Sequence, residues 1–153
     1  MNMKKLSFIF LLTLLAAGAE AQDLESKDVP SIVKVKLFSM YPKLDQEDID
    51  WSLENGCYQA ELDVNDMDVS VTFSPKGAVL EKKVELNPTD LPKPAGDYLS
   101  KTFPQKPLGD IFKVNDSKNT TTYLVTMDND ELIFDSAGKY LKTKEKEKVK
   151  SEK

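Results

Sequence analysis

The chain has 153 residues, about the length of one domain, and 40% of them are hydrophobic, which is enough for a packed core. It carries 21 basic and 26 acidic residues, every basic residue is a lysine, and histidine is absent. An acidic chain without arginine repels nucleic-acid backbones and lacks the side chain best suited to bidentate phosphate binding. The absence of histidine removes the commonest general base and metal ligand, so we expect no enzyme activity, no cofactor and no metal site.

Residues 1–21 have the pattern of a secretory signal peptide. Lys4 and Lys5 precede an apolar run over residues 6–17, and Ala19 and Ala21 place small residues where signal peptidase cleaves. The apolar run is too short to span a membrane, and polar chain follows it. We therefore expect a mature protein that begins at Gln22, has no membrane anchor, and is periplasmic or secreted.

The next segment predicts an amphipathic helix of about a dozen residues. Asp28 is a candidate cap, and Pro30 fits the first helical turn, where its missing N–H costs nothing. Pro42 ends the helical pattern. Apolar residues recur at helical spacing along the segment: Val29, Ile32, Val33, Leu37, Met40 and Tyr41.

Four antiparallel strands are predicted after this helix, over residues 49–54, 57–64, 67–74 and 79–86. The Asn55-Gly56 pair is a strong hairpin signal, because both turn residues need a positive φ. This turn places Trp51 opposite Ala60, and the next turn places Ala60 opposite Val71. The same register predicts the pairs Leu53–Tyr58, Ile49–Leu62, Leu62–Val69, Tyr58–Phe73, Phe73–Leu80 and Val69–Val84.

The residues that alternate with these apolar positions are polar and mostly acidic. Such alternation is typical of an antiparallel sheet with one dry face and one wet face. A wet face of this kind offers a surface for a protein partner. We therefore name six of its members as candidate partner-binding residues: Ser52, Glu54, Gln59, Glu61, Ser70 and Thr72.

The pattern of helix and strands then restarts, so that one unit of about 60 residues occurs twice. Phe134 repeats Phe73 and Gly138 repeats Gly77, both at the same separation along the chain. We predict a single domain over residues 22–141 that consists of two repeats, at about 28–86 and 90–141. In the second repeat we expect a helix that is secure from Ala95. We also expect strands around 108–114, 123–127 and 132–134, a turn at 129–130, and a last strand at 140–141. Residues 142–153, with six lysines and three glutamates, are interpreted as a charged tail outside the fold.

Two further features suggest chemistry and have simpler explanations. Cys57 is the only cysteine, and without a histidine to activate it we assign it no catalytic role. The acidic turns at 63–68 and 128–131 resemble calcium loops but lack the glycine and the terminal glutamate of such loops. Turn geometry alone favours Asn and Asp at these places. The alternative function is a small-ligand or metal-sensing periplasmic domain that works through the cleft between the two units.

Taken together, the pattern resembles the PepSY-like family, which comprises exported bacterial proteins also described as β-lactamase-inhibitor-like. The resemblance rests on Val/Leu-Pro at each helix start, an aromatic-Pro at each helix end, and two strand motifs: Tyr58-x-Ala60-x-Leu62 and Val69-x-Val71-x-Phe73-x-x-x-Gly77.

The resemblance implies an α+β fold that repeats a helix plus an antiparallel meander. In it, the helices pack on one face of the sheet and leave the other face open and concave, as in the β-lactamase inhibitor proteins. It further implies a non-enzymatic module that binds or inhibits a protein partner through the open face. This chain lacks the disulfides of those inhibitors, and the expected open face has few aromatic residues.

Overall fold

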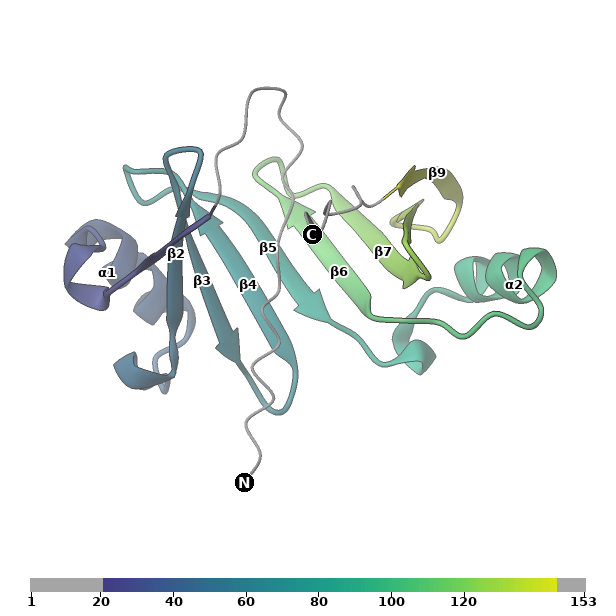
Figure 1. Cartoon of the computed structure of the whole chain (residues 1–153), viewed down its shortest axis with the longest axis horizontal. Helices are drawn as coiled ribbons and strands as arrows, with labels where there is room; N and C mark the ends of the chain where they lie inside the picture. Colours follow the sequence, from purple (N-terminus) through teal and green to yellow (C-terminus); the bar gives the residue numbers. More distant parts are fainter. Residues whose placement is uncertain (1–20, 146–153) are drawn as a thin grey trace, which may run out of the picture.

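The structure, a computed structural model, describes residues 21–145, and its strands form one nine-stranded antiparallel sheet (Figure 1). Each strand pairs with the next strand in the sequence, so the order across the sheet runs from β1 to β9. The expected signal peptide, apart from its last residue, lies outside the described residues, as does the tail beyond residue 145.

Two α-helices precede groups of four strands within the described residues. Helix α1 precedes β2 and helix α2 precedes β6, and Figure 1 shows the two helices near opposite ends of the sheet. The helices are α1 (Ser31–Met40) and α2 (Lys93–Thr102), and short 3₁₀ helices span Ser26–Asp28, Gln46–Asp48 and Pro88–Asp90. The strands are β1 (Gln22–Leu24), β2 (Asp50–Glu54), β3 (Cys57–Asp63), β4 (Asp68–Phe73), β5 (Val79–Glu85), β6 (Ile111–Asp116), β7 (Thr121–Met127), β8 (Asp130–Asp135) and β9 (Tyr140–Glu145).

The turns predicted from the sequence set the register of β2 to β4. Asn55 and Gly56 have φ angles of 50° and 76°, as a two-residue hairpin turn of type I′ requires. Trp51 lies opposite Ala60, which in turn lies opposite Val71, so these predicted pairs are confirmed. The structure also confirms the pairs Leu53–Tyr58, Leu62–Val69, Tyr58–Phe73 and Val69–Val84.

The prediction is wrong at the third corner. Phe73 lies opposite Val79 and not opposite Leu80, because the register shifts between Thr72 and Phe73. An irregularity of this kind inserts a residue into one strand and moves later pairs by one position. Turn chemistry fixes where a corner lies but not whether a bulge stands beside it.

The predicted start of α1 is also wrong. Asp28 lies in a 3₁₀ helix, and Pro30 is the residue that precedes the first helical turn, with no side-chain cap. The helix buries Val33 and Leu37, whereas Ile32, expected in the buried stripe, has 56% of its surface exposed. An apolar residue beside the buried stripe of a helix can have the same helical spacing as the residues within it. The spacing alone therefore does not show that Ile32 lies outside the buried stripe.

The two ends of the sheet differ from expectation. Strand β9 continues to Glu145, and Lys142 and Lys144 pair with Ile133 and Glu131, so residues 142–145 belong to the sheet and not to a tail. Strand β1, which the sequence did not predict, pairs with β2. The second helix begins at Lys93, two residues before its predicted secure part.

Buried hydrophobic residues form two clusters, which we call the first core and the second core. The first core joins Val33 and Leu37 of α1 to strand residues, and it includes the neighbouring rings of Trp51 and Phe73, 6.5 Å apart between centroids. In the second core, residues of α2 join residues of β6, β7 and β8. The strand members are Trp51, Ala60, Leu62, Val69, Val71 and Phe73 in the first core, and Ile111, Val125, Met127, Leu132 and Phe134 in the second.

These strand residues define two faces of the sheet. Successive side chains of a strand point to opposite faces, and residues paired across strands point to the same face. We call the face that carries the core residues the core face, and the other one the opposite face. Because β5 pairs with β6, with Lys83 opposite Val114, the opposite face is continuous across both groups of strands.

Candidate functional site

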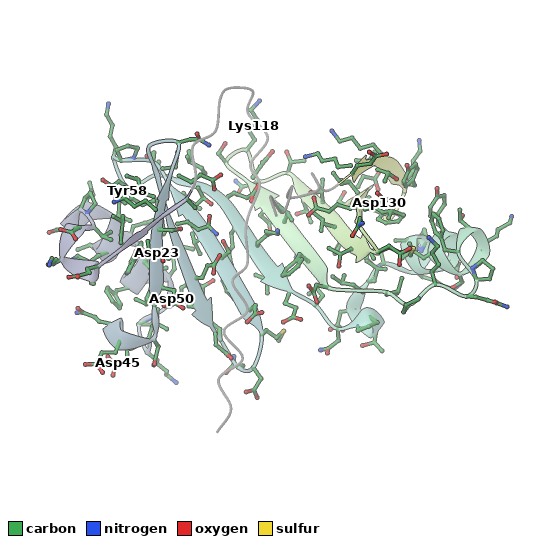
Figure 2. The ribbon with its side chains drawn as sticks, in the orientation of Figure 1. Asp23, Asp45, Asp50, Tyr58, Lys118 and Asp130 are labelled. Carbon is green, nitrogen blue, oxygen red and sulfur yellow. The ribbon has the colours of Figure 1, made fainter. Side chains whose placement is uncertain are left out.

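All six candidate partner-binding residues lie on the opposite face. Ser52, Gln59 and Thr72 are paired in a row across β2, β3 and β4. Asp23 of β1, which is labelled in Figure 2, pairs with Ser52 and extends the row to the sheet edge. Gln59 and Thr72 are buried, with 4% and 7% of their surface exposed. The other four candidates, Ser52, Glu54, Glu61 and Ser70, are half-buried and therefore present the more accessible part of this surface.

One side-chain network joins three of the candidates. The Gln59 amide Nε2 donates a hydrogen bond to Glu61 Oε1 at 2.9 Å and another to Ser70 Oγ at 3.1 Å. A buried amide that makes two such bonds holds its neighbours in place. The orientation of the Glu61 carboxylate is thus set by the sheet itself.

The acidic side chains of this face are held where solvation is poor. Burial raises the pKa of Glu61, and the nearby charge of Asp50, its partner across β2 and β3, adds to the increase. The hydrogen bond from Gln59 opposes it. Burial also raises the pKa values of Glu54 and Glu81. Each of these carboxylates is less stable in its charged form than it would be in water.

This leads to a pH-dependent prediction for the Glu61→Gln variant. A carboxyl whose pKa is raised by folding contributes stability that is complete below its unfolded value of 4.5 and is lost as the pH rises through the folded value. We expect the variant to be more stable than the wild type at pH 7, by less than about 1 kcal/mol because solvent screens this half-exposed group. The advantage should disappear near pH 4, as measured by urea unfolding at both pH values.

The exposed residue Glu47 provides the control for this experiment. Replacing Glu47 by Gln removes the same charge from the 3₁₀ helix at Gln46–Asp48, away from the sheet pairs. A stability difference for Glu61→Gln that is equal at pH 4 and pH 7 would contradict the role assigned to burial.

Sequence reasoning missed an apolar group on the opposite face of β6 to β8, which we call the apolar patch: Phe112, Val114, Leu124 and Ile133. Phe112 lies opposite Leu124, which lies opposite Ile133. Phe112 is buried, the other three are half-buried, and none belongs to either core. The signal was present in the sequence as unbroken apolar runs at 111–112, 123–125 and 132–134, since such runs are typical of strands with both faces apolar.

Lys83 lies between the acidic and the apolar parts of the opposite face. Its side chain is 4% exposed, and its ammonium Nζ is 4.7 Å from the centroid of the Phe112 ring, within the range of a cation–π contact. The charge of Lys83 also lowers the pKa values of Glu61 and Glu81, against the larger effect of burial. Lys83 therefore places a positive charge beside the acidic residues and contacts the apolar part through the Phe112 ring.

The remaining sequence candidates have ordinary structural roles. In the acidic turn at 63–68, Asn65 and Asp66 have positive φ angles, and the Asp66 N–H donates to Asp63 Oδ1 at 2.9 Å. Cys57 is half-buried and lies opposite Glu54. Among residues 21–145, no group of three or more Cys, Asp or Glu side chains is arranged to hold a metal ion. The helices in this part of the chain are also too short or too polar to cross a membrane.

Comparison with solved structures identifies the class to which this fold belongs. A BLIP-like protein from Bacteroides fragilis superposes with a TM-score of 0.64 and 19% sequence identity, over 76% of this chain and 85% of that protein. The chain therefore has a BLIP-like fold.

Two other solved proteins superpose with higher scores. A candidate periplasmic protein from Bacteroides eggerthii gives a TM-score of 0.70 at 18% identity, and a DUF2874 family protein from Bacteroides uniformis gives 0.69 at 17% identity. Each superposition covers 76% of this chain and 88% of the other protein. No family model matches the sequence, and no curated protein matches it significantly. At these identities the likeness establishes the fold alone.

Proposed function

We propose that the chain is a non-enzymatic periplasmic module that binds a protein partner through the opposite face of its sheet. One observation carries the proposal: both helices contribute their buried residues to the two cores, and the described part of the chain places no helix among the residues of the opposite face. The helices then cover one side of the sheet and leave the other side available to a partner.

The proposal includes the two tandem repeats expected from the sequence. Two corners at equivalent places in the two repeats have the same hydrogen bonds: the Ser74 N–H donates to the Ala78 carbonyl, and the Asp135 N–H donates to the Lys139 carbonyl, both at 2.9 Å. The register also shifts beside both corners, just before Phe73 in β4 and at the equivalent place in β8. A duplicated unit accounts for this correspondence, and joining two copies edge to edge makes the opposite face long.

A periplasmic location agrees with the signal-peptide pattern and with the candidate periplasmic protein of the same fold. Strand β1 begins at Gln22, the expected first residue of the mature chain. Cleavage before Gln22 would leave the whole nine-stranded sheet intact.

The chemistry of the face favours a protein over other partners. Residues 22–141 carry 13 basic and 22 acidic residues, and a surface of that charge repels nucleic acids and anionic lipids. Stable protein interfaces use about 20–30 residues on each side, and a continuous nine-stranded face supplies a surface of that order.

Reversing charge on this face tests the proposal. We expect the double variant Glu54→Lys, Glu61→Lys, immobilised as the mature protein, to capture its partner from periplasmic extract at least tenfold less well than the wild type. Both residues are half-buried on the opposite face, so the substitutions alter the surface on which the partner would lie. Capture is measured by quantitative mass spectrometry.

The control moves the same charges elsewhere. The double variant Asp45→Lys, Glu47→Lys has the same net charge but alters exposed residues around the 3₁₀ helix at Gln46–Asp48. Circular dichroism verifies that both variants are folded. Equal capture by the two variants would reject the opposite face as the binding surface.

A further inference from the structure

We propose that the opposite face binds an extended polypeptide segment with cationic side chains toward one end and bulky apolar side chains toward the other. The segment lies across the strands, with its cationic end over β2 to β5 and its apolar end over β6 to β8. This inference rests on the proposed function and names the kind of partner that the same face takes.

The two repeats have opposite chemistry at corresponding positions of this face. Phe112 and Val114 occupy in β6 the places that Ser52 and Glu54 occupy in β2, the equivalent strand of the first repeat. In the same way, Leu124 corresponds to Gln59 and Ile133 corresponds to Thr72. Several core positions remain apolar in both repeats, as Phe73 and Phe134 illustrate. The replacement of polar by apolar residues at these four places therefore lies on the opposite face, outside either core.

The face of β2 to β5 is suited to cations. Asp50 and Glu61 lie directly opposite each other, and like charges in that position repel. Glu85 is close enough for its Oε2 to accept a hydrogen bond from the Asp68 N–H at 3.3 Å, which places a further carboxylate at this end of the face. Lys83 of β5 also lies on this face, and its charge lowers the pKa of Glu61 against the larger effect of burial. A lysine or arginine of a partner would relieve the repulsion and compensate for the poor solvation of Glu61.

The apolar patch is suited to a hydrophobic anchor. Val114, Leu124 and Ile133 are half-buried and lie on adjacent strands. None of the three belongs to the first or the second core. Leucine-sized or aromatic side chains placed there would remove apolar surface from water without disturbing either core. Lys142, the partner of Ile133 on β9, makes this end of the face less favourable for a second cationic group.

The spacing of the two parts sets the length of the segment. Glu61 on β3 and Leu124 on β7 are four strands apart, or about 19 Å on a flat sheet. An extended chain advances about 3.3 Å per residue, so about five or six residues separate the cationic and apolar anchors.

Selection from a displayed library of random peptides of about twelve residues tests the inference on the mature protein. We expect the enriched peptides to carry Lys or Arg about five or six residues from Leu, Ile or Phe. The best peptide, synthesised with a fluorophore, should bind at least tenfold more weakly to Glu61→Lys and to Leu124→Ser, as measured by fluorescence anisotropy. Ile133→Ser serves as a second apolar variant if Leu124→Ser does not fold.

Matched variants on other surfaces serve as controls. Glu47→Lys and Val35→Ser change an exposed acidic and an exposed apolar residue elsewhere and should leave peptide affinity within twofold. Enrichment of peptides without the paired anchors, no enrichment at all, or affinity that both site variants leave unchanged would overturn the inference. Self-association of the wild type that Leu124→Ser abolishes in sedimentation would instead assign the patch to a second copy and would also overturn it.

The two proposals fail in different ways. If partner capture from extract depends on Glu54 and Glu61 while peptide selection fails, the face binds a partner that is not an extended segment. If neither experiment depends on the face, both proposals are wrong.

Discussion

Replacing Leu37 by alanine should lower the free energy of unfolding by about 2–5 kcal/mol, the range for a fully buried leucine whose removal leaves a cavity. Leu37 of α1 has no exposed surface and lies in the first core with Val33 and strand residues that include Trp51. Alanine is the better helix former, so any loss reports packing against the strands and not helix propensity. Urea unfolding followed by circular dichroism measures the change.

The same substitution at an exposed leucine provides the control. Leu141 on β9 is 50% exposed, and Leu141→Ala should change the free energy of unfolding by less than about 0.5 kcal/mol. Similar losses for the two variants would mean that α1 does not depend on the first core for its place in the fold.

Replacing Gly138 by alanine should destabilise the protein by about 2–5 kcal/mol, for two additive reasons. Gly138 has a φ of 83°, and a side chain in that left-handed region costs about 1–2 kcal/mol. A Cβ at this position would also lie 2.9 Å from Pro92 Cβ and 3.0 Å from the Ala95 backbone nitrogen, so α2 would have to move. Overpacking of this kind typically costs about 1–3 kcal/mol.

Gly56 separates the two contributions. It has a similar φ of 76°, but a Cβ built there meets nothing within 4 Å. Gly56→Ala should therefore cost only the backbone term, about 1–2 kcal/mol. If both variants lose the same free energy of unfolding in urea, a Cβ at position 138 does not clash with α2, which would contradict the prediction for Gly138.

The first half of the fold could be predicted because its turns and its alternation agree. Asn55-Gly56 fixes one hairpin, and strict alternation from Trp51 to Phe73 leaves a single register in which the apolar residues share a face. The acidic part of the opposite face follows directly from that register. The six candidate residues were therefore brought together as expected, although Gln59 and Thr72 proved to be buried.

The second half could not be predicted as well, because its strands do not alternate. In the run Tyr123-Leu124-Val125 every residue is apolar, so the pattern does not tell which side chains face the core. Only pairing with β6 and β8 decides that Leu124 lies on the opposite face. Residues 142–145 look like solvated tail by composition, and pairing with β8 makes them a strand, since strand formation depends strongly on context.

The two cores share no residue, and this separation determines how the molecule can deform. Backbone hydrogen bonds between β5 and β6 form the seam between the halves. We infer that a small rotation about this seam, which the contact of Lys83 with the Phe112 ring also crosses, changes the angle between the two groups of strands while the residues of each core keep their neighbours. On the proposed mode of binding, this rotation changes the distance between the acidic residues and the apolar patch, and with it the length of segment that the face accommodates.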